Sequence, residues 1–117
     1  MIELLNETEL PNSFVYPNEF IKIVNQGLID FEPWVIMSGE YLRSRYQGLK
    51  ERYNNRVLIP FARRLDNDDI ACWDIENPDK VYIVHDFASK GWEQKKIYDN
   101  FWQWFKKIID DMIEHDN

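Results

Sequence analysis

The pair of residues best suited to acid–base chemistry is His85 and Asp86, which end an apolar run that begins at Val81. A carboxylate beside an imidazole can select the histidine tautomer and raise its basicity. Neighbouring residues of a strand point to opposite faces, so these two side chains are not expected to pair directly. We therefore expect His85 to be a structural residue that hydrogen-bonds to the backbone. A small hydrolase that uses His85 is the minor alternative.

A nucleophile and a cation site can also be considered, but neither has the surroundings that its chemistry needs. The serines do not lie in the context of a nucleophile elbow. Cys72 lies in an apolar run between Ala71 and Trp73, where a free cysteine is usually a small buried side chain with a raised pKa. The aspartates of the turn 66–69 could collect calcium, but the twelve-residue loop with its glycine and terminal glutamate is missing. We expect no catalytic set, no metal and no cofactor.

The acidic and aromatic side chains favour binding over catalysis. Five Trp, six Tyr and seven Phe are more than one core stripe needs, so some rings should reach the surface, where they suit a protein interface. A dense acidic stretch would attract a basic partner. The alternatives are that the carboxylates only solubilise turns and that the Trp residues only pack in the core. The predicted partner-binding residues are Asp66, Asp68, Asp69, Asp74, Glu76, Asp79, Trp92 and Trp102.

Two helices are predicted in the first half of the chain. Residues 17–26 begin with a proline and are followed by Gly27, which are typical start and stop signals of a helix. Ser38 can cap a second helix, whose arginines should lie on its solvated flank. The apolar residues of this helix recur at helical spacing and are Leu42, Tyr46, Leu49 and Tyr53.

The second half of the chain predicts a sheet covered by a helix. Residues 57–62, 70–75 and 81–87 are apolar runs separated by polar turns, which indicates a three-stranded meander. Pro60 cannot donate to a ladder, so the first of these strands should be an edge, bulged or broken there. A stripe of apolar residues predicts one long amphipathic helix over 94–114. Together these elements predict an α+β fold, with a small, mostly antiparallel sheet packed with helices.

Composition is consistent with a single domain over residues 1–117 and argues against several classes of protein. The 14 basic and 21 acidic residues leave a net charge of −7, which repels a phosphate backbone and disfavours nucleic acid as a direct partner. One cysteine rules out a disulfide framework and fits a reducing compartment, so we expect a cytoplasmic protein. We expect no membrane association, because no signal peptide and no apolar run of about 18 residues is evident. Oligomeric state is left open.

Charge is unevenly distributed along the chain. Residues 1–40 carry one lysine against seven acids, residues 41–65 carry seven basic residues against one acid, and residues 66–117 carry six against thirteen. The basic segment could form a patch for an anion. We expect it instead to be a solvated flank that pairs with the acidic segments on either side.

Short motifs mark these elements along the chain: LPNSF at 10–14 with PNEF at 17–20, LIPFA at 58–62, IACWD at 70–74, VYIVHD at 81–86 and FWQWF at 101–105. These motifs and their order resemble those of the SUKH superfamily, which includes relatives of a yeast cell-wall assembly regulator and many bacterial immunity proteins. The turn 66–69 lacks the glycine that the family commonly has there, and the N-terminal helical region is short.

The resemblance implies a binding module with no catalytic residues to carry over. We therefore expect a non-enzymatic protein-binding domain, an immunity protein that binds and neutralises a polymorphic toxin, such as a nuclease. A regulatory or scaffolding module without a toxin partner is the alternative. The sequence does not identify the toxin.

Overall fold

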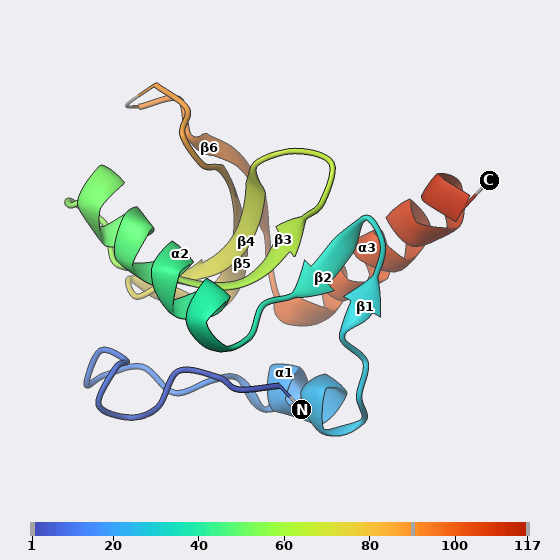
Figure 1. Cartoon of the computed structure of the whole chain (residues 1–117), viewed down its shortest axis with the longest axis horizontal. Helices are drawn as coiled ribbons and strands as arrows, with labels where there is room; N and C mark the ends of the chain where they lie inside the picture. Colours follow the sequence, from blue (N-terminus) through green and yellow to red (C-terminus); the bar gives the residue numbers. More distant parts are fainter. Residues whose placement is uncertain (1, 90, 117) are drawn as a thin grey trace.

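Six antiparallel strands form one sheet in the part of the chain that the structure, a computed structural model, describes, residues 2–89 and 91–116 (Figure 1). Each strand pairs with its neighbour in the sequence, so the predicted meander of β3, β4 and β5 lies within a longer one. The predicted α+β fold is confirmed. The strands are β1 (Asp30–Phe31), β2 (Trp34–Ile36), β3 (Leu58–Arg64), β4 (Asp69–Asp74), β5 (Asn77–His85) and β6 (Gln94–Tyr98).

Pro60 lies in β3, where β4 pairs with the strand on one side, whereas β2 on the other side pairs only with Ala62, Arg63 and Arg64. At Pro60 the strand is therefore a local edge. The register between β3 and β4 also shifts between Pro60 and Ala62. Both features fit a residue that has no N–H to donate to a ladder, so two of the three outcomes expected for Pro60 are observed.

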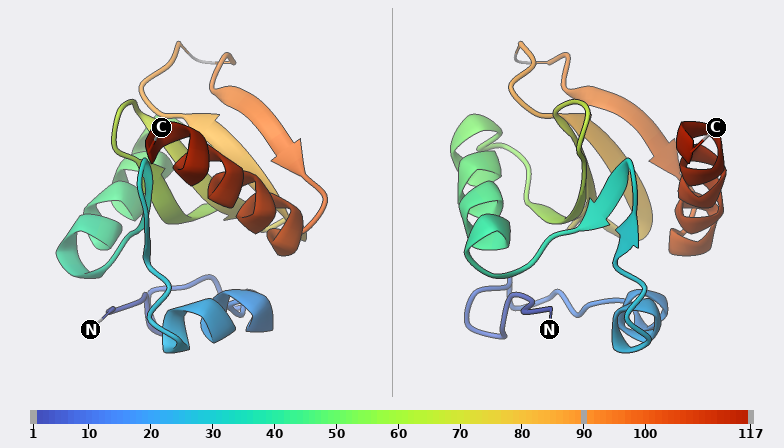
Figure 2. Two further views of the ribbon diagram at one scale, coloured as in Figure 1. Left: turned by 90° about the vertical axis from the view of Figure 1, so that its right-hand side faces the viewer. Right: turned by 45° about the vertical axis from the view of Figure 1, so that its right-hand side comes forward.

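The described residues form three helices that pack around the sheet, α1 (Asn18–Asn25), α2 (Gly39–Arg52) and α3 (Phe101–Asp116). The right view of Figure 2 shows α2 and α3 on opposite faces of the sheet. Every residue of β4 and the first five of β3 are buried, as expected for strands covered on both faces. Helix α1 begins and ends within one residue of its predicted bounds, and α2 begins directly after Ser38, as predicted. No helix in the described ranges is long and apolar enough to cross a membrane.

Aromatic side chains dominate the core. The rings of Phe61 and Trp73 stack with their centroids 4.1 Å apart, and Phe20 meets Trp73 edge to face at 5.1 Å. Trp104 of α3 packs against Phe61 at 4.9 Å. Offset and edge-to-face arrangements of this kind are the favoured ones, so α1, α3 and the central strands share one packed cluster.

The long helix predicted over 94–114 is wrong at its start. Gln94–Tyr98 is strand β6, paired with β5, and Ile97 is exposed rather than part of a buried helical stripe. The helix begins at Phe101 because of a local cap: Asn100 Oδ1 accepts from the N–H of Gln103 at 2.9 Å, and Gln103 Oε1 accepts from the N–H of Asp99 at 3.1 Å. This reciprocal pair resembles a capping box and terminates any helix that would run through from 94.

Ser38 has the N-cap position of α2, but its side chain does not cap the helix. Its Oγ accepts from the backbone N–H of Glu3 at 2.8 Å instead. The hydroxyl therefore holds the N-terminal segment against the start of α2. Leu42, Tyr46 and Leu49 are buried as predicted.

Candidate functional site

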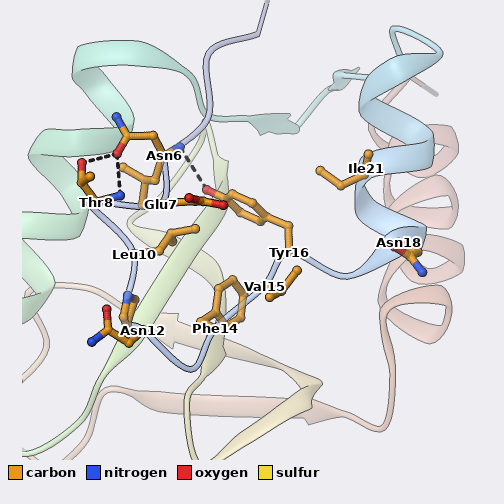
Figure 3. Close-up of a pocket in the computed structure, with 12 residues that line it drawn as sticks. Asn6, Glu7, Thr8, Leu10, Asn12, Phe14, Val15, Tyr16, Asn18 and Ile21 are labelled. Carbon is orange, nitrogen blue, oxygen red and sulfur yellow. Dashed lines mark hydrogen bonds between the residues drawn. The ribbon is translucent and has the colours of Figure 1, made fainter.

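A hollow with a volume of about 920 Å³ lies beside the N-terminal segment (Figure 3). Several of its polar groups are already used: Thr8 Oγ1 donates to Asn6 Oδ1 at 2.6 Å, and Tyr16 Oη accepts from the N–H of Leu5 at 3.2 Å. Among the described residues that line it, Glu7 is the one carboxylate, and no histidine or cysteine accompanies it. This hollow therefore does not offer an acid–base pair.

A different region combines exposed apolar groups with buried charges. The turn 65–68 and the residues 86–89 and 91–93 lie at one end of the sheet, because β3 and β5 both end there and β4 and β6 both begin there. The backbone N–H of Asp86 donates to the carbonyl of Asp68 at 3.0 Å, which joins the two segments directly. We call this region the loop end. Its exposed apolar side chains are Leu65, Phe87 and Trp92.

Asp86 is the buried anchor of the loop end and has no exposed surface. Arg52 donates to its carboxylate from Nε at 2.7 Å and from Nη2 at 2.6 Å, and Arg45 donates from Nη1 at 3.0 Å. The backbone N–H of Phe87 provides a fourth hydrogen bond at 3.0 Å. A buried carboxylate is strongly unfavourable unless it is paired and hydrogen-bonded, and here both oxygens are satisfied.

Phe87 covers this ion pair in a strained backbone conformation. Its φ of 69° is in the left-handed region, which costs a residue with a Cβ about 1 kcal/mol or more. The guanidinium carbons of Arg52 and Arg45 lie 4.1 Å and 5.3 Å from the centroid of its ring. These cation–π contacts offset part of the strain. The ring is nevertheless 59% exposed, so burial does not explain why an aromatic residue has this position.

Trp92 is 80% exposed, although the segment around it is held by several hydrogen bonds. Its backbone N–H donates to the backbone carbonyl of Ser89 at 2.9 Å. The next residue, Glu93, is buried: its Oε1 accepts from the N–H of Gly91 at 2.9 Å, and its carbonyl accepts from the N–H of His85 at 2.7 Å. Hydrogen bonds thus hold the backbone of Trp92 and of both its neighbours.

His85 and Asp86 do not pair with each other, as predicted. The Nδ1 of His85 lies 2.9 Å from Asp69 Oδ1, and Lys95 Nζ lies 2.9 Å from the other oxygen of that carboxylate. The prediction that the His85 side chain hydrogen-bonds to the backbone is therefore wrong. The register of β4 and β5 places Asp69 directly opposite His85.

In the described part of the chain, no serine or cysteine side chain is hydrogen-bonded to His85. Cys72 is fully buried, its thiol lies 3.5 Å from the carbonyl of Tyr82, and burial raises the pKa of that thiol, as predicted from the sequence. Asp69 and its neighbours Asp66 and Asp68 do not form a metal site, since no group of three potential ligands is arranged for one within 2–89 and 91–116.

The eight predicted partner-binding residues do not form one surface. Asp66, Asp68 and Trp92 lie at the loop end and are exposed, whereas Glu76, Asp79 and Trp102 are exposed at the opposite end of the sheet. Asp69 and Asp74 are buried, and each is held by a basic side chain. The separation follows from the length of β4, because the turns before and after a strand lie at its two ends.

The basic segment 41–65 pairs with acids from both sides of the sequence, as expected. Arg43 binds Glu3, and its Nε lies 2.6 Å from Glu9 Oε2, which lowers the pKa of Glu9. Arg64 Nε lies 2.7 Å from Asp66 Oδ1 and lowers the pKa of that carboxyl.

The expectation that the α2 arginines lie on a solvated flank is wrong for Arg45 and Arg52, whose side chains are 14% and 29% exposed. Both reach the buried Asp86 across one face of the helix. Sequence reasoning therefore missed the Asp86 anchor, Phe87 and Glu93. One signal was present: Gly48, an unfavourable residue inside a helix, lies between the two arginines.

The chain matches no protein-family model, no curated protein and no solved structure.

Proposed function

We propose that this chain is a non-enzymatic protein-binding domain and that the loop end is its contact surface. The observation that carries the proposal is the exposed Trp92 on a segment that buried Asp86 and Glu93 hold in place. Trp is enriched among residues that dominate binding energy, and a surface ordered in advance loses less entropy on binding. The strained, exposed Phe87 beside it supports the same interpretation.

The partner that fits this surface is a basic protein. The whole chain has a net charge of −7, and the turn 65–68 exposes Asp66 and Asp68 beside the aromatic side chains. Arg64 pairs with Asp66, whereas Asp68 has no ion pair within the described residues. Carboxylates in this position would speed association with a positively charged surface and favour that partner over others.

The resemblance to the SUKH superfamily leads us to propose that the partner is a toxin domain and that the chain neutralises it as an immunity protein. A toxin that acts on nucleic acid needs a basic surface, which is complementary to the loop end. A regulatory or scaffolding module without a toxin is the second candidate. The neighbouring reading frame distinguishes the two, because a large toxin gene there favours immunity and an unrelated operon favours regulation.

Co-expression with the toxin domain that the neighbouring frame encodes tests the proposal. The wild-type chain should restore growth, and Trp92→Ala should weaken binding by about 2 kcal/mol, close to 30-fold. Val15→Ala is the control, because it removes an exposed apolar side chain from the N-terminal segment, away from the loop end (Figure 1). Equal binding by the wild type and Trp92→Ala, with both folded, would exclude the loop end as the contact surface.

The hydrolase alternative rests on the hydrogen-bonded His85 and Asp69. A carboxylate on Nδ1 is the arrangement that a general base requires, but Lys95 shares the same carboxylate and reduces its effect on the imidazole. The purified protein should show no turnover on panels of esters, phosphoesters and glycosides. Turnover that disappears in His85→Ala would show instead that the chain is an enzyme.

A further inference from the structure

We propose that a cleft at the opposite end of the sheet from Trp92 binds the side chain of an arginine in an extended segment of a protein partner. The cleft has a volume of about 360 Å³ and lies among the first turns of α1 and α3 and the start of β5. The left view of Figure 2 shows the beginnings of both helices on the same side of the molecule. We call it the helix-start cleft. Its chemistry comes from Glu19, Asp79 and Trp102.

The charges of the helix-start cleft favour a cation. Glu19 and Asp79 contribute two carboxylates, and in the described part of the chain neither lies within ion-pair distance of a basic side chain. The N-termini of the two helices offset part of this negative charge, since each is equivalent to about half a positive charge. The sum is about one negative charge, so a cation is attracted and an anion is repelled.

The aromatic wall of the cleft favours arginine among cations. Trp102 is 41% exposed, and its ring meets Phe101 and Phe105 edge to face at 5.6 Å and 5.8 Å, which holds it in place. Trp is the strongest aromatic partner of a cation. A guanidinium group is planar and weakly hydrated, so it can stack on the indole while donating to a carboxylate, whereas a lysine ammonium cannot do both as well.

The volume of the cleft limits the size of the ligand. It is near the lower bound of about 300 Å³ for small-molecule sites, so one side chain fits better than a cofactor. The carboxylates and the indole that line the cleft both suit the guanidinium group of one arginine side chain. This inference does not rest on the loop end being a contact surface, because the two regions lie at opposite ends of β4.

The test follows Trp102 directly by fluorine NMR of the full chain labelled with 5-fluorotryptophan. Trp102→Phe assigns the resonance. The probes are acetyl-Gly-Arg-Gly-amide, the same peptide with citrulline, which is the neutral analogue, and the same peptide with glutamate. The arginine peptide should shift the Trp102 signal saturably with a dissociation constant of about 1 mM, and the citrulline peptide should bind about ten-fold more weakly.

Two variants test the electrostatic part of the proposal. Asp79→Asn should weaken binding of the arginine peptide about ten-fold, and Glu19→Gln should also weaken it. Asp79 is exposed and Glu19 is partly exposed, so both variants should fold as the wild type does. The matched control Asp68→Asn removes one carboxylate from the loop end and should leave binding of the peptide unchanged.

Three results would overturn the proposal. The first is the absence of a saturable Trp102 shift with the arginine peptide. The second is equal binding of the arginine and citrulline peptides, which would mean that charge plays no part. The third is tighter binding of the glutamate peptide, which would show that the helix N-termini rather than the carboxylates determine the ligand. None of these results bears on Trp92, so the proposed function is tested separately.

Discussion

Arg52 holds the carboxylate of Asp86 with two hydrogen bonds, from Nε at 2.7 Å and from Nη2 at 2.6 Å, and the two residues are 34 positions apart in the chain. The pair joins α2 to the end of β5 beneath an exposed phenylalanine ring. Because the carboxylate is fully buried, its stability depends on these partners and not on water. The shape of the loop end follows from this one link.

The first prediction concerns Asp86 itself. Asp86→Asn keeps the size of the side chain but leaves two arginines without their shared negative charge. Breaking a buried pair in this way should lower the free energy of unfolding by about 3 kcal/mol. Urea denaturation measures the change. Glu76→Gln, an exposed control, should stay within about 0.5 kcal/mol of the wild type. An equally small effect of Asp86→Asn would mean that the carboxylate is not buried in solution.

The second prediction concerns Gly48, where a Cβ would lie 2.7 Å from Arg52 Nη2. Inside a helix, alanine normally raises the free energy of unfolding by about 1 kcal/mol relative to glycine. Here the added Cβ forces the guanidinium to shift while two hydrogen bonds hold it on the buried Asp86. Gly48→Ala should therefore reduce stability by about 1 kcal/mol, since weakening these charged hydrogen bonds outweighs the propensity gain.

Combining this substitution with Arg52→Ala tests the reason for the effect. Without the guanidinium, Gly48→Ala should stabilise the chain by about 1 kcal/mol, so the sign of the effect reverses. Denaturant curves of the four proteins give the coupling energy. The same effect in both backgrounds would show that the contact between a Cβ at position 48 and the Arg52 guanidinium does not affect stability.

The third prediction separates the strain of Phe87 from the contribution of its ring. Phe87→Gly and Phe87→Ala both remove the ring, but only glycine adopts a φ of 69° without strain. The glycine variant should be more stable than the alanine variant by about 0.5–1 kcal/mol, even though glycine has more freedom in the unfolded chain. If the alanine variant is the more stable in thermal or urea unfolding, the left-handed conformation is not maintained in solution.

The fourth prediction concerns stability at high pH. Burial raises the pKa of Tyr16 to about 12, and its Oη accepts from the N–H of Leu5. The pKa of Tyr16 is higher in the folded chain than in the unfolded chain, so the neutral phenol adds to the free energy of unfolding. This stabilisation is fully present below pH 10 and is lost as the pH rises toward 12. Tyr46, Tyr53 and Tyr98 also have raised pKa values, so they share in the loss.

Tyr16→Phe isolates the share of one residue. The variant should be less stable than the wild type at neutral pH, since the N–H of Leu5 loses its acceptor. The difference should shrink as the pH rises through the interval from 10 to 12, when measured by urea unfolding at each pH. A constant difference would show that Tyr16 titrates normally in the folded state.

Local sequence was sufficient to predict the helices and strands whose start, stop and apolar-spacing signals lie within about fifteen residues of one another. The proline before α1, the glycine after it and the helical spacing of Leu42, Tyr46 and Leu49 are such signals. The apolar runs of β3, β4 and β5 are others, since their polar turns are short. Burial of Cys72 followed from its two apolar neighbours in the chain.

Tertiary structure decided the features that depend on distant partners. Gln94–Tyr98 contains residues that a helix accepts, and only pairing with β5 makes it a strand, so its state was not readable from local periodicity. The acids of 66–79 are close in sequence, yet β4 separates them and buries Asp69 and Asp74. Arg45 and Arg52 look like surface residues of a helix until the layer opposite them is known. Which carboxylate an arginine meets is determined by how the layers pack, because that contact joins segments more than thirty residues apart.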